Sequence, residues 1–414
     1  MKNRIILIFV LLISNIIIPQ EMESPENIEE NIKIYLDCWE CDLSFFRQNL
    51  ELVNFVRDPK LADIHILVTV QITASGSNEY GINFIGRNQY SDIQYKLKTI
   101  STAHESDILR WERLLKILEI GILPYLSYTN QITNININYK SENDLEKVVV
   151  NSIPWDYWVY RLGVSSRFQA EESQNEYSFS SSFNADRITD LLKFKSGVSY
   201  YIQNEEYLDE NEFIQTRKIE AEFDTDLIYS INPRLSAGIF GRINKSSYLN
   251  LHLASNIGAA IEYNIFPWDK SDRKVLTLAY QLNSKYFEYD KLTIYNKLKE
   301  TKMSESLELS LILRQPWGDI ENTVEASHYF YDFSKNRLSL NTDMTINIIS
   351  GFSFFTHLNA ELIHDQLYLP SGGSTREELL LQQNQLETSY NIFWNIGIRY
   401  TFGSIYNNIV NQRL

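Results

Sequence analysis

The only two cysteines of the chain, Cys38 and Cys41, stand in a C-x-x-C spacing. In an exported protein this spacing is compatible with a small disulfide, with two free thiols, or with a redox or metal site. The residues that follow them give a modest helix signal without a thioredoxin-like context, and no further Cys or His nearby supplies metal ligands. The sequence therefore favours a structural disulfide, with the other two interpretations as alternatives.

Two histidines lie near residues with which they could form a hydrolytic site. His252 and Ser255 are three apart in a segment of alternating character, so they point to opposite faces of a strand and cannot act together. His364 and Asp365 are adjacent, which also directs them to opposite sides while they remain in a strand. We therefore expect no enzymatic activity, and the sequence indicates no catalytic residue, cofactor or metal.

Charged side chains of both signs recur at alternate positions in the middle of the chain. They are expected to line one common, inward face, and the candidate lining residues are Arg161, Arg167, Lys193, Lys195, Glu220, Glu222, Asp224, Asp226, Arg234, Arg242 and Glu262. The acidic group falls between two basic groups. One interpretation is an internal network of ion pairs that fills the interior. The other is a polar channel with a charged constriction.

The segments that carry these charges alternate apolar and polar residues over their whole length. From Leu249 to Ile265 the odd positions are almost all apolar, and the even positions are small or polar. A strand of a membrane β-barrel shows this pattern, because successive side chains face lipid and lumen in turn. We therefore predict a transmembrane antiparallel β-barrel over 155–403. Its outward residues should include Leu251, Ile257 and Ile261.

About twelve such strands can be counted, an even number as expected when both ends of a barrel lie in the periplasm. They begin near 157, 176, 192, 217, 234, 249, 273, 305, 319, 337, 351 and 389. The connections alternate between short and long, and the three longest, at 203–216, 287–304 and 367–388, all follow odd strands. This parity predicts short periplasmic turns and long extracellular loops. Whether the last loop, with Gly372 and Gly373, folds inward as a plug or outward is left open.

Aromatic residues gather at both predicted borders of the membrane, where their amphipathic rings are favoured. Tyr157, Trp158, Phe266, Trp268 and Trp317 mark the periplasmic border, and Tyr286, Phe330, Tyr331 and Tyr390 mark the other.

The last strand resembles the C-terminal recognition signal of outer-membrane barrels, through Asn395, Gly397, Tyr400 and Phe402. The resemblance implies that the barrel-assembly machinery is a partner. The chain departs from the usual pattern because a tail, 404–414, follows the aromatic residue and is expected in the periplasm.

The N-terminal third has a different organisation. Lys2 and Arg4 precede an apolar run, which predicts a signal peptide over 1–20, too short for a comfortable membrane span. Mixed strand and helix periodicity over 31–135, including a helical stripe from Asp107 to Leu126, predicts a small α/β domain, and the polar segment 136–154 reads as a linker. The stretch Asp58–Val68 resembles the start of periplasmic α/β domains of TolB-like and curli-secretion-like proteins. Those domains dock protein partners in the cell envelope, which implies such a partner here.

Composition limits the possible functions. The chain has 414 residues, a net charge of -15 and no basic cluster, so it would repel nucleic acid rather than bind it. Together these features predict a protein of the outer membrane of a Gram-negative bacterium, in contact with its lipid, with the N-terminal domain and the C-terminus in the periplasm. Two functions remain compatible with the sequence: a narrow pore or transporter for small solutes, and an anchor that presents the N-terminal domain to an envelope partner.

Overall fold

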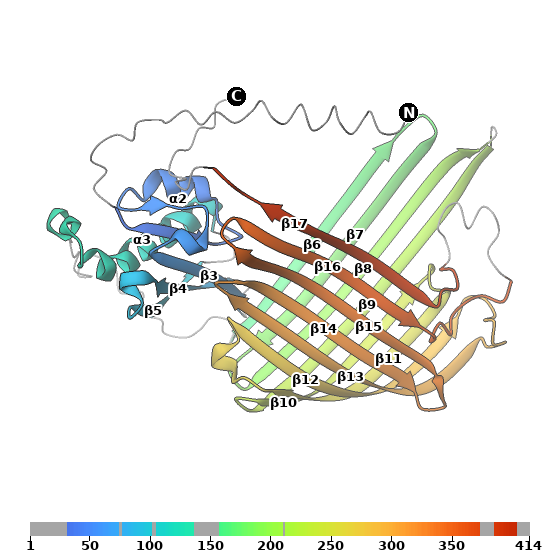
Figure 1. Ribbon diagram of the computed structural model, residues 1–414. Helices are drawn as coiled ribbons and strands as arrows, with labels where there is room; N and C mark the ends of the chain where they lie inside the picture. Colours follow the sequence, from blue (N-terminus) through green and yellow to red (C-terminus); the bar gives the residue numbers. More distant parts are fainter. Residues whose placement is uncertain are drawn as a thin grey trace, which may run out of the picture.

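The computed structural model describes residues 31–73, 77–101, 105–135, 157–209, 212–372 and 385–403. The predicted signal peptide, the predicted linker 136–154, the C-terminal tail 404–414 and Gly373 lie outside these ranges. Within them the chain forms a small α/β domain followed by one large antiparallel sheet (Figure 1).

The N-terminal domain is built on a five-stranded mixed sheet in the order β2-β1-β3-β4-β5. Its strands are β1 (Lys33–Asp37), β2 (Asn54–Phe55), β3 (Ile64–Ile72), β4 (Asn78–Gly86) and β5 (Gln94–Ser101). Strands β1, β2 and β3 are parallel neighbours, whereas β3, β4 and β5 form an antiparallel meander. The sequence pattern had not indicated β2, because two residues are too few to show a period.

Two helices complete the domain: α2 (Leu43–Asn49), whose N-cap Asp42 accepts a bond from the Ser44 amide, and α3 (Asp107–Leu126). The apolar stripe of α3 packs on the sheet through Leu114, Leu118 and Ile122, all at most 2% exposed, beside the central strands. Burial of the Tyr125 hydroxyl, which donates to the Ile93 carbonyl at 2.9 Å, raises its pKa to about 12. The domain thus has a continuous core of its own.

Cys38 and Cys41 are joined by a disulfide directly before α2, with the two Cα atoms 5.4 Å apart.

The second part is a meander of twelve antiparallel strands in which each strand pairs with its neighbours in sequence. The first six are β6 (Trp158–Ala170), β7 (Gln174–Ile188), β8 (Leu192–Asp209), β9 (Glu212–Asn232), β10 (Leu235–Ser246) and β11 (Leu251–Asn264). The last six are β12 (Lys274–Tyr289), β13 (Lys299–Gln315), β14 (Gly318–Tyr329), β15 (Asp332–Ile349), β16 (Phe352–Ile363) and β17 (Tyr390–Tyr400). The predicted number of strands and their antiparallel order are confirmed.

The sheet curls strongly, so that its last strands lie in front of its first strands in Figure 1. It is not closed in this structure, since no pairing between the described residues joins β6 to β17 and these two strands are its edges. Complete closure, which the prediction of a barrel included, is therefore not observed. Both edge strands are exposed along nearly their whole length.

Loop lengths differ from the prediction at two places. The predicted loop 287–304 is shorter, because β12 runs to Tyr289 and β13 begins at Lys299. The region 203–216 was expected to be a long loop, but β8 and β9 continue through most of it as a hairpin in which Asp209 lies opposite Glu212. Polar residues occupy both faces of this hairpin, so alternation is lost although the backbone remains extended. At the end of the sheet that meets the N-terminal domain, four of the five connections have two or three residues; at the other end the connections after β6, β8 and β14 are equally short, and the longest connection of the sheet follows β16.

One predicted orientation is wrong. Leu251 was expected to point outward with Ile257 and Ile261, but it is 4% exposed, while Ile257 is 71% exposed. A register shift between Leu251 and Leu253 in the pairing with β12 places two residues opposite one and reverses the direction of Leu251. Alternation therefore begins at Leu253, beyond the irregularity.

Candidate functional site

The register of the sheet brings the predicted charged residues to one face. Opposite pairs such as Lys195–Asp226, Asp224–Arg242 and Ser236–Glu262 continue from strand to strand, and apolar pairs such as Phe223–Ile243 occupy the other face. Ten of the candidate residues lie on strands of this first face, which we call the inner face: Arg161, Arg167, Lys193, Lys195, Glu220, Glu222, Asp224, Asp226, Arg242 and Glu262. Arg234 instead lies in the turn before β10.

Several of these charges pair with neighbouring charges on the inner face. Arg161 forms an ion pair with Asp186 of the adjacent strand, and Arg242 Nε lies 3.0 Å from Glu222 Oε1. Lys193 of β8 also interacts electrostatically with Glu262 of β11, three strands away, which fits the curl of the sheet in Figure 1. Charge pairing of this kind favours a filled interior over an open channel.

Between the residues that the structure describes, the N-terminal domain contacts one end of the sheet through four hydrogen bonds or ion pairs. Lys60 Nζ donates to the Ile348 carbonyl at 2.7 Å, and Gln71 Nε2 donates to Ser271 Oγ at 3.2 Å. The Gly351 amide donates to Asp58 Oδ2, and Lys96 forms an ion pair with Asp272. We call this set the docking contacts. Ser271 and Asp272 lie in the β11–β12 connection, whereas Ile348 is near the end of β15 and Gly351 is in the turn after it, so the domain spans several strands.

Local geometry explains how Asp58 can reach the sheet. Its other carboxylate oxygen caps the 3-10 turn Pro59–Leu61 by accepting from the Lys60 amide at 2.8 Å, which fixes the side chain. Gly351 adopts a positive φ of 74° in the β15–β16 turn, and a Cβ there would collide with the Thr401 carbonyl. Only glycine therefore lets the turn present its amide to Asp58 and its carbonyl to the Thr401 amide.

A buried chain of polar groups lies on the domain side of this junction. His65 is completely buried, and its Nε2 lies 3.0 Å from Asp37 Oδ2 while its Nδ1 lies 3.3 Å from Arg87 Nη2. Because a guanidinium can only donate, Nδ1 must accept and Nε2 carries the proton that is donated to Asp37. Burial lowers the pKa of Arg87, partly offset by the Asp58 charge. Burial, then the charges of Asp37 and Asp58, raises the pKa of Tyr35.

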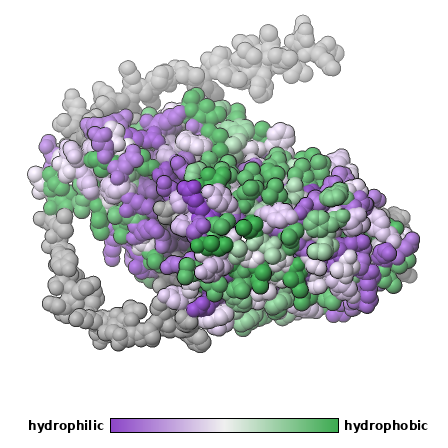
Figure 2. Space-filling model, turned by 90° about the horizontal axis from the view of Figure 1, so that it is seen from below, coloured by the Kyte–Doolittle hydropathy of each residue, from purple (hydrophilic) through white to green (hydrophobic). Residues whose placement is uncertain are grey.

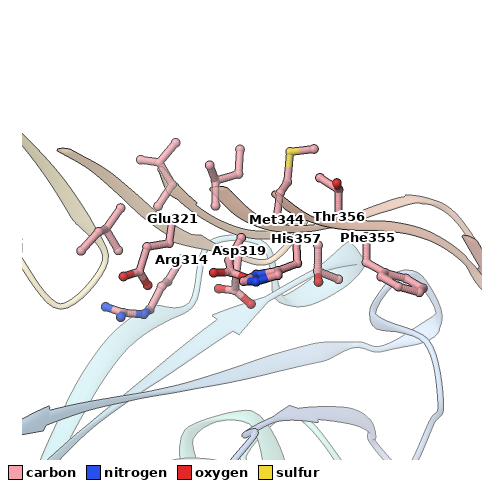
Figure 3. Close-up of a pocket in the computed structure, with 12 residues that line it drawn as sticks. Arg314, Asp319, Glu321, Met344, Phe355, Thr356 and His357 are labelled. Atoms are coloured by element: carbon pink, nitrogen blue, oxygen red, sulfur yellow. The ribbon is translucent and has the colours of Figure 1, made fainter. Parts of the chain in front are cut away.

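Facing this chain is a pocket of ≈ 240 Å³ on strands β13 to β16. Arg314, Asp319, Glu321, His357 and Phe355 project from the sheet toward the N-terminal domain, whereas Met344 and Thr356 project to the opposite side (Figure 3). Asp319 interacts electrostatically with Asp37 of the domain. The pocket is therefore charged and lies between the inner face and the domain.

The pocket does not form a recognisable catalytic or metal site. His357 Nδ1 pairs with Asp343 Oδ1, and its Nε2 accepts from Asn359 Nδ2 at 2.9 Å, so both ring nitrogens are engaged. Over the ranges that the structure describes, no cluster of His, Cys, Asp and Glu could hold a metal ion. His252 and His364 also make other contacts than the sequence suggested: His252 Nδ1 lies 3.1 Å from Asp290 Oδ1, and His364 Nδ1 lies 2.9 Å from Asn336 Oδ1.

Sequence reasoning did not find the docking contacts. Lys60, Lys96 and Asp272 are ordinary surface charges in a sequence, and their partners are more than 170 positions away. Asp58-Pro59 offered the only signal, because an Asp before Pro is a common cap of a helical turn. Its second contact, with Gly351, could not be read from that pattern.

Among the helices that the structure describes, none combines the length and apolarity needed to cross a bilayer. No family model matches the chain, and no curated protein matches it. Among solved structures, the chain is similar to the β domain of the Bordetella autotransporter BrkA, with 10% sequence identity and a TM-score of 0.26, over 59% of this chain and 98% of that domain. A similarity of this size assigns neither a family nor a function.

Proposed function

We propose that the twelve-stranded sheet is an outer-membrane β-barrel and that this barrel anchors the N-terminal domain at the periplasmic face. The apolar outer face carries the proposal. Leu162 is 77% exposed, Ile257 71% and Ile398 67%, and they come from β6, β11 and β17, far apart around the sheet. Figure 2 shows an apolar band over the sheet with hydrophilic surface on both sides. An apolar surface this extensive requires a nonaqueous partner, and a bilayer matches its band shape.

Aromatic side chains support the same placement. At the end of the sheet next to the domain, the outer face carries a row of rings contributed by several strands: Trp158, Phe194, Tyr229, Tyr263, Phe352 and Tyr400. Trp268 and Trp317 lie in turns at that same end. Such a row is expected at the level of the lipid headgroups. The domain then lies at the end away from the longest connection, which follows β16. Because the long loops of a bacterial barrel are extracellular, this end would be the periplasmic one.

A sheet in hydrocarbon cannot keep open edges, because each unpaired backbone group costs several kcal/mol. We therefore expect β6 and β17 to pair with each other. β6 has 13 residues and β17 has 11, so three antiparallel registers pair all of β17. Only two of them keep polar residues on the inner face, namely those that place Ser165 opposite Phe393 or opposite Asn395.

Cysteine cross-linking tests this closure. Ser165→Cys combined with either Phe393→Cys or Asn395→Cys should form a disulfide in the membrane-embedded protein. The matched control is Ser165→Cys with Asn341→Cys, on the inner face of β15, two strands from the seam. Absence of a cross-link in both seam pairs would show that the edges do not meet.

The anchoring role rests on the docking contacts, which hold the domain across the turn end of the barrel. Cysteine labelling with a membrane-impermeant maleimide tests the arrangement, because the native cysteines are in a disulfide. Glu112→Cys on the exposed side of α3 should react only after the outer membrane is permeabilised. Phe333→Cys, in the β14–β15 hairpin at the other end, should react in intact cells. The reverse pattern would invert the proposed topology and refute it.

A narrow pore for small solutes is the second candidate, favoured by the polar inner face that runs from β6 to β17. The two functions differ in conductance. As an anchor with paired internal charges and a docked domain, the full chain should give no large, stable current steps in planar bilayers. Stable steps from the unmodified protein would favour the pore.

A further inference from the structure

The segment that follows β16 does not extend away from the sheet but runs back to strands on its far side. β16 ends at Ile363, and the next residues, His364–Ser371, contact the β12–β13 loop and the start of β11. Three strands separate β16 from β12, and four separate it from β11. In a ring of twelve strands this is between a third and a half of the circumference. The segment therefore crosses the mouth opposite the N-terminal domain.

Backbone pairing fixes the crossing. The Ile294 amide donates to the Leu369 carbonyl, and the Ser371 amide donates to the Leu292 carbonyl, both at 2.8 Å. Thr293 and Pro370 form an antiparallel bridge between these two bonds. The segment is thus paired like a short strand with the β12–β13 loop. Leu369, 5% exposed, is buried by this pairing.

Asn250 holds three segments together at the same place. It is 4% exposed and adopts a positive φ of 55° directly before β11. Its Nδ2 donates to the Tyr368 carbonyl at 2.9 Å and to the Lys291 carbonyl at 3.0 Å, and its Oδ1 accepts from the Lys291 amide at 2.7 Å. The buried side-chain amide of Asn250 thus has its hydrogen bonds made, and these bonds join the three segments in one arrangement.

The segment also explains why large apolar side chains lie on the inner face at this end. Leu251, Ala254 and Tyr289 are buried there, with Phe287 beside them, and Tyr368 of the segment packs against this cluster. The register shift that turns Leu251 inward serves this contact. Apolar residues that face an open aqueous lumen contribute no stabilisation from burial. When Tyr368 covers them, they are removed from water and stabilise a closed mouth.

An ion pair fastens the start of the segment to the inner face. Arg337 of β15 lies 2.9 Å from Asp365 through Nη2 and 3.1 Å from Glu361 through Nη1. One arginine thus joins the segment to the strand that it leaves. The crossing is held at its start by charge and at its end by backbone bonds.

We infer that His364–Ser371 is an internal plug that closes the extracellular mouth of the barrel. The inference rests on the proposed barrel and goes beyond it, because it adds a second closure to the one made by the docked domain. The two closures lie in series. Releasing one of them leaves the lumen blocked, and releasing both opens it.

The position of the plug is tested by a disulfide. Thr293→Cys with Pro370→Cys should cross-link readily in the full chain, since bridge partners are directly opposite each other. The control pair is Pro370→Cys with Glu171→Cys, which lies in the β6–β7 hairpin. This test does not require a closed seam, so it is independent of the cross-links between β6 and β17. No disulfide in the first pair would overturn the plug.

Its closing action is tested by conductance. The plug-release variant is Asn250→Ala with Arg337→Gln, the domain-release variant is Asp272→Lys, and a third protein carries all three changes. The unmodified chain and each release variant alone should show no stable current steps, and the combined protein should show them. Steps from the domain-release variant alone, or none from the combined protein, would overturn the plug as a closure. Failure of the seam cross-links would instead overturn the barrel.

Discussion

Replacing Asp272 by asparagine should loosen the N-terminal domain from the sheet without unfolding either part. The Asp272 side chain is 10% exposed and that of Lys96 29%, so their ion pair is largely shielded from water. A hydrogen bond to a charged group contributes about 1.5–3 kcal/mol, and removing one partner of a fully buried pair costs about 3–5 kcal/mol. Because Lys96 keeps partial access to water, we expect a loss of about 1–3 kcal/mol, or roughly 5- to 150-fold in the docking equilibrium.

The Gly351 amide provides a direct assay. It donates to Asp58 of the domain, so its hydrogen exchange should be slow only while the domain is docked. Exchange at Gly351 should accelerate by the same factor in Asp272→Asn, while amides in the middle of β4 remain unchanged. Asp190→Asn, in the exposed β7–β8 turn, is the matched control. If Asp272→Asn changed Gly351 protection no more than the control did, the pair would not stabilise docking.

Three further predictions concern the two faces of the sheet, the core of the domain and the disulfide. Leu309→Lys, on the outer face of β13, should lower barrel stability by about 2–4 kcal/mol if it lies near the bilayer midplane, whereas Ser310→Lys on the inner face should lower it much less. Heat-modifiable gel migration measures both variants, and equal effects would contradict the assignment of the faces. Leu118→Ala should destabilise the N-terminal domain by about 2–5 kcal/mol, since the side chain is 2% exposed in the core. Hydrogen exchange of the β3 amides should accelerate while that of the β13 amides does not change, and unchanged exchange in β3 would refute this prediction. Cys38→Ser with Cys41→Ser should lower the stability of the N-terminal domain by about 2 kcal/mol, because the unfolded chain regains the entropy of a short loop. The same hydrogen exchange measures this change, and a gain in stability would contradict a structural role of the disulfide.

The periodicity of the second part predicted most of its architecture, because alternation over a long strand is a repeated signal. The start of β11 shows the limit: Leu249, Leu251 and Leu253 continue the alternation in the sequence, yet the register shift turns Leu251 inward. An irregularity in pairing depends on the neighbouring strand, which a pattern within one strand does not contain. The same reasoning applies to the hairpin of β8 and β9, where pairing maintains strands without apolar alternation.

The candidate site was predictable in part. The charged inner face followed from spacing alone, since parity sets the side of each residue once a strand is assigned. The docking contacts and the plug did not follow, because Asp58 with Gly351 and Asn250 with Tyr368 join segments 293 and 118 positions apart. Single polar residues in turns carry no periodic signal. Only the folded arrangement shows which of them meet.

The orientation of the two faces can be measured directly with spin labels at Ile257 and at Asn256, neighbours on β11. In the membrane-embedded protein, the label at 257 should collide with lipid-soluble oxygen and be shielded from a water-soluble relaxation agent. The label at 256 should show low access to oxygen. Equal access at both positions, or the reverse preference, would contradict a sheet whose apolar face meets the bilayer.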